Sequence, residues 1–100
     1  MTKQEIISKL QDKLKFGVPF QAKVKFDFGD DGIVFIDTMQ SPPAFSENDD
    51  EADVTLACKV ETFEGFLNGT KDPNMAFMMG QLKVRGSMGL AMKMNALLED

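Results

Sequence analysis

The residue types that most enzymes use for catalysis are scarce in this chain of 100 residues. It contains no histidine and no tyrosine, and its one cysteine is Cys58. General acid–base chemistry would therefore fall to carboxylates, lysines or this thiol. Since Cys58 has no histidine to act as its base, a small buried apolar residue is a better interpretation of it than a nucleophile. Because the carboxylates fall in predicted turns, loops and polar strand positions, we expect no catalytic residue and no enzymatic activity.

Two further segments have compositions that suggest binding chemistry. Residues 48–53 bring four acids and an asparagine together, but they lack the glycine and the terminal glutamate of a calcium loop at the required spacing, so a solvated acidic loop is favoured. Residues 86–89 have the outline of a nucleotide-contacting GxxG loop without basic surroundings beyond Arg85. The sequence therefore predicts no metal, no cofactor and no nucleic-acid partner, in keeping with a formal net charge of −5.

The charges are distributed unevenly along the chain. Residues 1–26 carry six lysines against Glu5 and Asp12, whereas residues 27–53 carry nine acids and no base. The basic first quarter has two interpretations. A solvated helix face is favoured on general grounds, and the alternative is a transient contact with an anionic membrane surface.

The first half of the chain predicts a helix followed by a β-hairpin. Residues 2–5 (TKQE) form a capping box, and the helix that follows ends at Gly17 and Pro19. Its apolar side is formed by Ile6, Ile7, Leu10 and Leu14. Alternation of apolar and polar residues predicts a strand over 20–28 and a partner strand over 33–39, joined by a turn at 29–32.

The middle of the chain is less regular. Two prolines at 42 and 43 leave room only for a short edge strand over 44–47. Residues 53–59 alternate again and predict a strand. Residues 61–68 predict a helix whose inward side carries Phe63, Phe66 and Leu67, and Gly69 ends it.

The stretch from 72 to 95 has the most unusual composition, because it holds six of the eight methionines. Asp72 followed by Pro73 is typical of a helix N-terminus, and Gly80 provides a left-handed stop. A short strand is predicted over 81–85, with Leu82 and Val84 on one side. Gly86 ends this strand, and Ser87 caps a final helix through Leu98.

The final helix is apolar around most of its circumference, so we expect most of it to be buried. Methionine is flexible and polarizable, which suits a surface that adapts to a variable apolar shape. Periodicity alone nevertheless favours ordinary core residues over the wall of a ligand cavity.

The pattern resembles a known family. The ungapped run DPNMAFMMGQLKVRGSMGLAMKM is similar to the C-terminal signature of the sterol carrier protein type 2 family. The resemblance implies one domain over 1–100 with an α+β fold, in which a curved, mostly antiparallel five-stranded sheet is covered by helices on one face. It also implies an apolar tunnel between sheet and helices for fatty acyl chains, acyl-CoA, sterols or isoprenoids.

We therefore expect the chain to bind and transfer an apolar lipid without catalysing a reaction. We also expect a shift of the final helix to let the lipid enter. Met79 stands where many members of the family have a glutamine near the ligand's head group, which favours a purely apolar ligand or a membrane contact. The residues expected to line the cavity are Phe63, Phe66, Leu67, Phe77, Met78, Leu82, Val84, Met88, Leu90, Met92 and Met94.

Two other functions remain open at this point. The apolar final helix would also suit a protein-interaction or dimerisation module, and the chain would suit an accessory domain beside an acyl-chain enzyme. We expect a monomer or a weak dimer. The polar start and the absence of a Ser-Lys-Leu-type ending favour a cytoplasmic location, bacterial rather than peroxisomal.

Overall fold

An open five-stranded sheet forms one layer of the protein. The computed structural model describes residues 2–15, 18, 20–40 and 42–98. The strands are β1 (Lys23–Asp27), β2 (Ile33–Asp37), β3 (Ala44–Ser46), β4 (Val54–Ala57) and β5 (Lys83–Gly86), in the order β3-β2-β1-β4-β5. Only β1 and β4 run parallel; the other three neighbouring pairs are antiparallel. The predicted α+β fold with a mostly antiparallel sheet is therefore confirmed.

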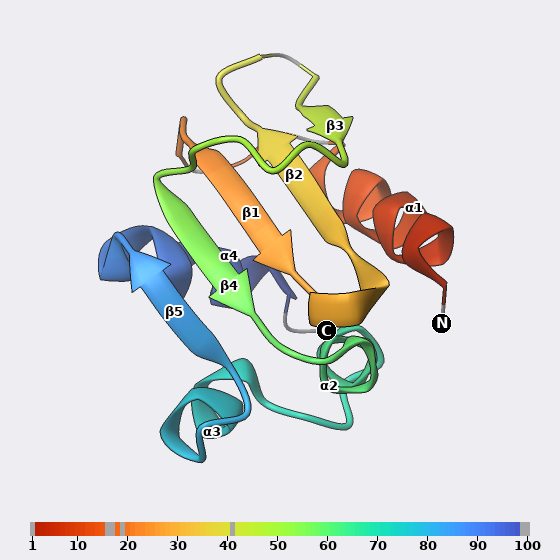
Figure 1. The fold of residues 1–100 in the computed structure, drawn as a ribbon, viewed down its shortest axis with the longest axis vertical. Helices are drawn as coiled ribbons and strands as arrows, with labels where there is room; N and C mark the ends of the chain where they lie inside the picture. Colours follow the sequence, from red (N-terminus) through yellow and green to blue (C-terminus); the bar gives the residue numbers. More distant parts are fainter. Residues whose placement is uncertain (1, 16–17, 19, 41, 99–100) are drawn as a thin grey trace.

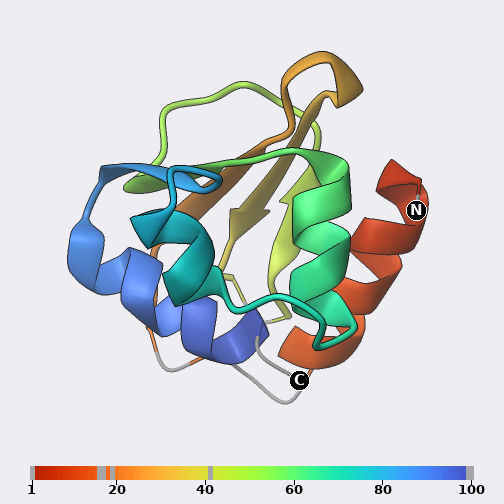
Figure 2. The same cartoon turned by 90° about the horizontal axis from the view of Figure 1, so that it is seen from below.

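Helices form the second layer. They are α1 (Lys3–Leu14), α2 (Val60–Leu67), α3 (Pro73–Met78) and α4 (Met88–Leu98), and a 3₁₀ turn, η1 (Gly29–Asp31), joins β1 to β2. All four α-helices lie on one face of the sheet, while the loop over 47–53 crosses the opposite face (Figures 1 and 2). None of the described helices is long and apolar enough to cross a bilayer.

The core fills the space between the two layers. Every second strand residue points toward the helices, as the period of a strand requires. The largest fully buried side chains are Phe26, Phe63, Phe66, Ile6, Leu10, Leu14, Ile36, Leu56, Met94, Leu98, Val24 and Val34. Phe63 lies at the centre of an aromatic group, because its ring meets those of Phe26, Phe28 and Phe66 edge to face at 5.1, 5.2 and 6.1 Å.

Helix α1 has the predicted capping box. The Glu5 amide donates to Thr2 Oγ1 at 3.2 Å, and the Thr2 amide donates to Glu5 Oε1 at 3.0 Å. The hydrogen bonds from Thr2 lower the pKa of the Glu5 carboxyl. The predicted helix end at Gly17 and Pro19 lies outside the described residues.

The β1–β2 hairpin is shorter than predicted. The ladder runs from the pair Lys23–Asp37 to the pair Asp27–Ile33. Beyond it, the Thr38 amide still donates to the Ala22 carbonyl at 3.0 Å. The buried Thr38 side chain adds two bonds, because its Oγ1 accepts from the Ala22 amide at 2.9 Å and donates to the Ala22 carbonyl at 2.8 Å. Phe20 and Ala22 are therefore buried without belonging to the strand.

The helix–strand–helix order over 72–98 is confirmed. Asp72 Oδ1 accepts from the Asn74 amide at 2.8 Å, and Ser87 Oγ accepts from the Leu90 amide at 3.3 Å, so both predicted caps form. Gly80 follows α3 with φ +79°. Gly86 has φ +94° and lies so close to the start of β4 that a Cβ there would be 2.4 Å from the Asp53 carbonyl oxygen.

The expected burial around most of α4 is wrong. The helix is an outer layer, so only the side facing the sheet is covered, and that side carries Ala91, Met94, Asn95 and Leu98. Met88 and Met92 are exposed.

Candidate functional site

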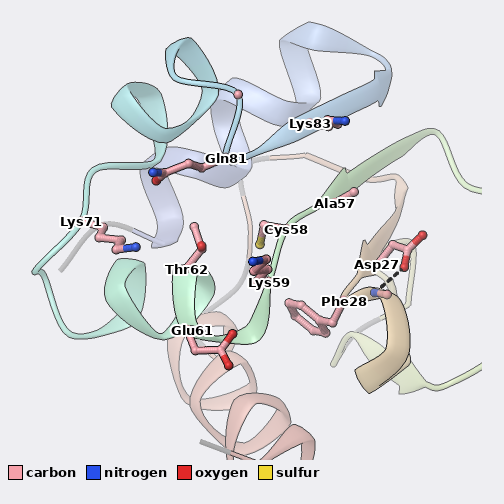
Figure 3. Close-up of a pocket in the computed structure, with 12 residues that line it drawn as sticks. Asp27, Phe28, Ala57, Cys58, Lys59, Glu61, Thr62, Lys71, Gln81 and Lys83 are labelled. Atoms are coloured by element: carbon pink, nitrogen blue, oxygen red, sulfur yellow. Dashed lines mark hydrogen bonds between the residues drawn. The ribbon is translucent and has the colours of Figure 1, made fainter.

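A groove of about 810 Å³ opens at the end of the sheet where β1 and β4 stop. Three segments that are distant in sequence meet there: the end of β1, the junction of β4 with α2, and the approach to β5. Figure 3 shows their side chains around the open space. The groove is lined by Asp27, Phe28, Gly29, Ala57, Cys58, Lys59, Glu61, Thr62, Lys71, Gly80, Gln81 and Lys83.

Buried side chains form the inner part of the groove. Phe28 and Thr62 are both buried, and Cys58 is half-buried. The β1–β4 pairing positions this part, since the Cys58 amide donates to the Asp27 carbonyl at 3.1 Å just past the parallel ladder. Burial raises the pKa of the Cys58 thiol to about 12. The thiol is therefore protonated at neutral pH and is a poor nucleophile.

Exposed polar side chains surround the mouth of the groove. Lys59, Lys71, Gln81 and Lys83 all belong to this rim. Lys71 is held over α2, because its side-chain stem covers Gly65 so closely that a Cβ there would be 2.7 Å from Lys71 Cγ. The same groove also carries the carboxylates of Asp27 and Glu61, so three ammonium groups outnumber two carboxylates and the excess of one positive charge favours an anionic group at the mouth.

A second groove of about 520 Å³ adjoins the first. The two share Ala57, Gly80 and Lys83, so they flank the same short segment between α3 and β5. The second groove is more apolar, and its remaining lining residues are Phe77, Leu82, Val84 and Arg85. Together the grooves reach from the polar rim to the edge of the apolar core.

The residues expected to line a cavity fall into three sets. Phe63, Phe66, Leu67, Leu82 and Met94 are buried in the core. Val84 and Leu90 are partly buried and pack against it. Phe77, Met78, Met88 and Met92 are exposed. Of all eleven, the structure brings Phe77, Leu82 and Val84 to a groove, and the cavity wall as a whole stays a prediction.

Sequence reasoning did not identify Asn95. Its side chain is buried on the inner side of α4, and its Oδ1 has no hydrogen-bond partner among the described residues. Its position four residues after Ala91 and three before Leu98 places it on the buried side of the helix, so helical spacing offered a signal. The polar groove residues Lys59, Lys71 and Gln81 had no such signal, because they meet only through the tertiary fold.

The acidic segment 48–53 gives no metal centre in the part of the chain that is described. No group of three or more potential metal-ligating side chains occurs among those residues. Instead, Asp49 Oδ1 accepts from Lys25 Nζ at 2.6 Å, and Asp53 Oδ2 accepts from the Lys23 amide at 2.9 Å. Most of the segment is exposed, as a solvated loop would be.

Comparison with known proteins agrees with this architecture. The SCP-2 sterol transfer family matches residues 2–99. The chain belongs to this family. It is 34% identical over 84 residues to hydroxysteroid dehydrogenase-like protein 2 of Bos taurus, covering 80% of this chain and 20% of that protein. It is 33% identical over 101 residues to human sterol carrier protein 2, covering 94% and 18%.

Solved structures of the family share the fold. The palmitated SCP2L2 of Aedes aegypti aligns with a TM-score of 0.74 at 16% identity, over 100% of this chain and 96% of that one. This SCP-2 chain spans about a fifth of the length of the bovine and human relatives. Membership in the family supports lipid binding or transfer in general.

Proposed function

We propose that this SCP-2 chain binds an acyl lipid between its sheet and its helices and hands it on without catalysing a reaction. The observation that carries the proposal is the pair of adjoining grooves, about 810 and 520 Å³, on either side of segment 80–83. Their volumes lie in the range of small-molecule sites. They join a polar rim to the edge of an apolar core, which is the arrangement that a lipid with one anionic end requires.

The apolar core would hold the hydrocarbon chain. Leu82 lines the second groove, and Phe63 and Met94 belong to the same buried core cluster. Each methylene that this core removes from water contributes ~0.8 kcal/mol. Met94 can change rotamer to follow the chain. The unpartnered Asn95 Oδ1 would accept a hydrogen bond from a lipid that carries a hydroxyl at its buried end, and this would remove the cost of leaving it unpaired.

The expected shift of the final helix stays a prediction, since α4 has four buried residues that hold it on the sheet. We propose that the connection between α3 and β5 opens instead. Helix α3 buries only Pro73 and Ala76, so little contact holds it. A Cβ at Gly80 would have no neighbour within 4 Å, which leaves this segment room to move. Lys59, Lys71 and Lys83 would then hold the carboxylate or phosphate end at the rim. The palmitated relative supports an acyl chain as the ligand.

A fluorescent fatty-acid analogue tests the proposal. Delipidated protein should raise the fluorescence of the analogue to a saturating level, and unlabelled palmitate should displace the analogue. Because Cys58 lines the first groove, bound palmitate should also slow alkylation of this thiol by a small maleimide. Flat titrations with folded protein, across fatty acids and acyl-CoAs, together with an unchanged alkylation rate, would overturn the proposal.

A pair of charge reversals tests the role of the rim. Lys71→Glu should weaken binding of the analogue by roughly tenfold, because it replaces attraction by repulsion at the mouth. Lys9→Glu on α1 makes the same change of charge outside the groove and should bind like the parent. If the parent and both variants bind the analogue with equal affinity, the rim lysines do not hold an anionic end of the lipid.

An accessory role beside an enzyme is the second candidate. It is favoured by the relative named hydroxysteroid dehydrogenase-like protein 2, of which this chain matches a fifth. A transfer assay between two vesicle populations separates the roles, because a free carrier accelerates transfer whereas an accessory domain binds lipid without doing so. The cytoplasmic location stays a prediction.

A further inference from the structure

Strand β5 forms one edge of the sheet. It pairs with β4 on its inner side, and in the described part of the chain no strand lies beyond it in the order β3-β2-β1-β4-β5. Figure 1 shows β5 at the border of the sheet. An edge strand presents backbone N–H and C=O groups with which a further strand can pair.

The register of β5 shows which of its backbone groups point outward. The Ser87 amide, just past the strand, donates to the Asp53 carbonyl on the β4 side at 3.0 Å. Residues of an antiparallel strand alternate between bonding to the partner strand and facing away from it. Counting back from Ser87, Val84 and Gly86 are the residues that face away. Their N–H and C=O groups therefore point to the outer edge.

The two edges of the sheet differ in how well they can accept a strand. At the other edge, β3 has only three residues and follows prolines at 42 and 43. Short length and proline are means by which edge strands avoid further pairing. Strand β5 contains no proline, and its Gly86 is exposed and has no side chain to shield the backbone. Strand β5 is therefore the edge that suits an added strand.

The second groove adjoins this edge. Its lining includes Lys83, Val84 and Arg85 of β5 and Phe77 of α3. Because successive side chains of a strand point to opposite faces, a groove that touches three in a row passes around the strand. Since β4 occupies the inner edge, the groove passes the outer edge or the end of β5. A strand added to β5 would therefore have apolar contacts with Val84 and Phe77.

The charges beside β5 are mixed, and Lys83 is the cation available to a partner. Val84 packs against the core, so Lys83 and Arg85 on either side of it point to the face away from the helices. Arg85 already lies 3.8 Å from Asp27. The exposed Lys83 has no ion pair in the described part of the chain. The acids that line the neighbouring first and third grooves are Asp27, Glu61, Asp49 and Glu51.

A second copy of the chain is a poor occupant of this edge. In an antiparallel pair of β5 strands, Val84 opposite the copy's Gly86 would place Arg85 against Arg85. Val84 opposite Val84 would place Lys83 against Arg85. Like charges directly opposite each other destabilise a strand pair. These cations therefore hinder pairing between copies, and they leave the edge open to a strand that carries acids.

We propose that β5 accepts an extended acidic peptide of a partner protein as a sixth strand of the sheet. The outward N–H and C=O groups of Val84 and Gly86 bond to the peptide backbone, which makes the partner a polypeptide. An acidic side chain of the peptide meets Lys83, and the next side chain, which is apolar, points to the opposite face beside Val84. The inference goes beyond the proposed carrier function and does not rest on it.

Synthetic peptides test the backbone pairing. A fluorescein-labelled peptide of about seven residues, in which glutamate and valine alternate, should bind delipidated protein in a fluorescence anisotropy titration. Two further peptides carry N-methyl groups on every valine amide or on every glutamate amide. Only one of these two should lose binding, by roughly tenfold, because the amides of an added strand point alternately toward β5 and away from it. Binding retained by both methylated peptides, or lost by both, would overturn the proposal.

Charge reversals test the acidic character of the partner. Lys83→Glu should weaken binding of the glutamate–valine peptide by roughly fivefold, because it replaces attraction by repulsion. Lys9→Glu on α1 makes the same change of charge away from β5 and should bind the peptide like the parent. A peptide with lysine in place of glutamate should bind the parent chain by roughly fivefold more weakly. Equal affinity of Lys83→Glu and Lys9→Glu for the acidic peptide would contradict the proposed contact.

Amide hydrogen exchange locates the bound peptide on the sheet. The peptide should slow exchange of the Val84 and Gly86 amides by roughly tenfold and leave the amides of β3 unchanged. Slower exchange at β3 with no change at β5 would overturn the proposal. A concentration-dependent dimer that protects Val84 and Gly86 without peptide would assign the edge to a second copy and overturn it as well. A chain that binds the peptide but no fatty acid would support this inference and count against the carrier function alone.

Discussion

Two buried polar side chains of this SCP-2 domain differ in whether their polar atoms have hydrogen-bond partners. Thr38 satisfies its hydroxyl fully at the end of the β1–β2 hairpin. Asn95 leaves Oδ1 without a partner in the described structure. An unpaired buried acceptor costs about 1–3 kcal/mol. Under the proposed function, a bound lipid would supply the missing donor, and Asn95 would then connect stability to ligand binding.

Replacing Asn95 by leucine tests that connection. We expect Asn95→Leu to raise the free energy of unfolding of the ligand-free protein by about 1 kcal/mol, because the unpaired acceptor is removed. It should weaken binding of a fatty alcohol more than binding of the matching alkane. Asn74→Leu on the exposed part of α3 is the control, and its effect should stay within about 0.5 kcal/mol. Denaturation by urea and ligand titration measure both quantities, and a destabilised Asn95→Leu protein would contradict the account.

The Cys58 thiol gives a prediction on pH dependence. Since burial raises its pKa to about 12, the reactive thiolate stays a small fraction throughout the mildly alkaline range. The alkylation rate of the folded protein should therefore rise about tenfold per pH unit from about pH 8 to about pH 10 without levelling. The unfolded chain should level near the ordinary thiol pKa of 9.0. A plateau near pH 9 in the folded protein would show that the thiol is not shielded.

At the scale of elements, local sequence signals predicted where the helices begin and end, but not which of their side chains are exposed. Asp72, Gly80 and Ser87 act on their own neighbours, so the limits of α3 and α4 were predictable from the sequence. The exposure of Met88 and Met92 was not, because it depends on which side of α4 meets the sheet. The alternation over 20–28 likewise overran β1, since a strand ends where its partner ends rather than where its pattern does.

The candidate site was predictable only in its apolar part. Leu82 and Phe77 belong to a periodic segment, so their contribution could be inferred. Lys59 and Lys71 reach the same groove because β4 pairs in parallel with β1 and α2 then turns back across the sheet end. That meeting of distant segments has no local signature in a single sequence.

The contact between β5 and the start of β4 gives a prediction for this element. Gly86→Ala should destabilise the protein by at least about 2 kcal/mol, since it combines strain at φ +94° with a Cβ 2.4 Å from a backbone oxygen. Gly80→Ala has a similar φ of +79° and open space around it, so it should cost only about 1 kcal/mol. Urea denaturation of both variants measures the difference. If both variants lose the same free energy of unfolding, the close approach of Gly86 to the start of β4 does not contribute to stability.

At the scale of the whole molecule, charge and apolar surface are segregated. The acidic loop lies over the open face of the sheet (Figure 1), and Met75, Met78, Met88 and Met92 are exposed on α3 and α4. A lipid carrier needs a dry interior and a side that meets the lipid source, and this arrangement offers both. The eight methionines also provide natural probes of these two regions.

Methyl NMR of the methionines tests lipid binding most directly. Met94 is fully buried in the core, whereas Met39 is exposed on the segment after β2. When palmitate is added to delipidated protein carrying ¹³C-methyl methionine, the Met94 signal should shift and saturate at a one-to-one ratio, and the Met39 signal should stay in place. A Met94 signal that does not move, while the exposed methionines shift together without saturating, would mean that lipid only adsorbs to the surface and would contradict the account.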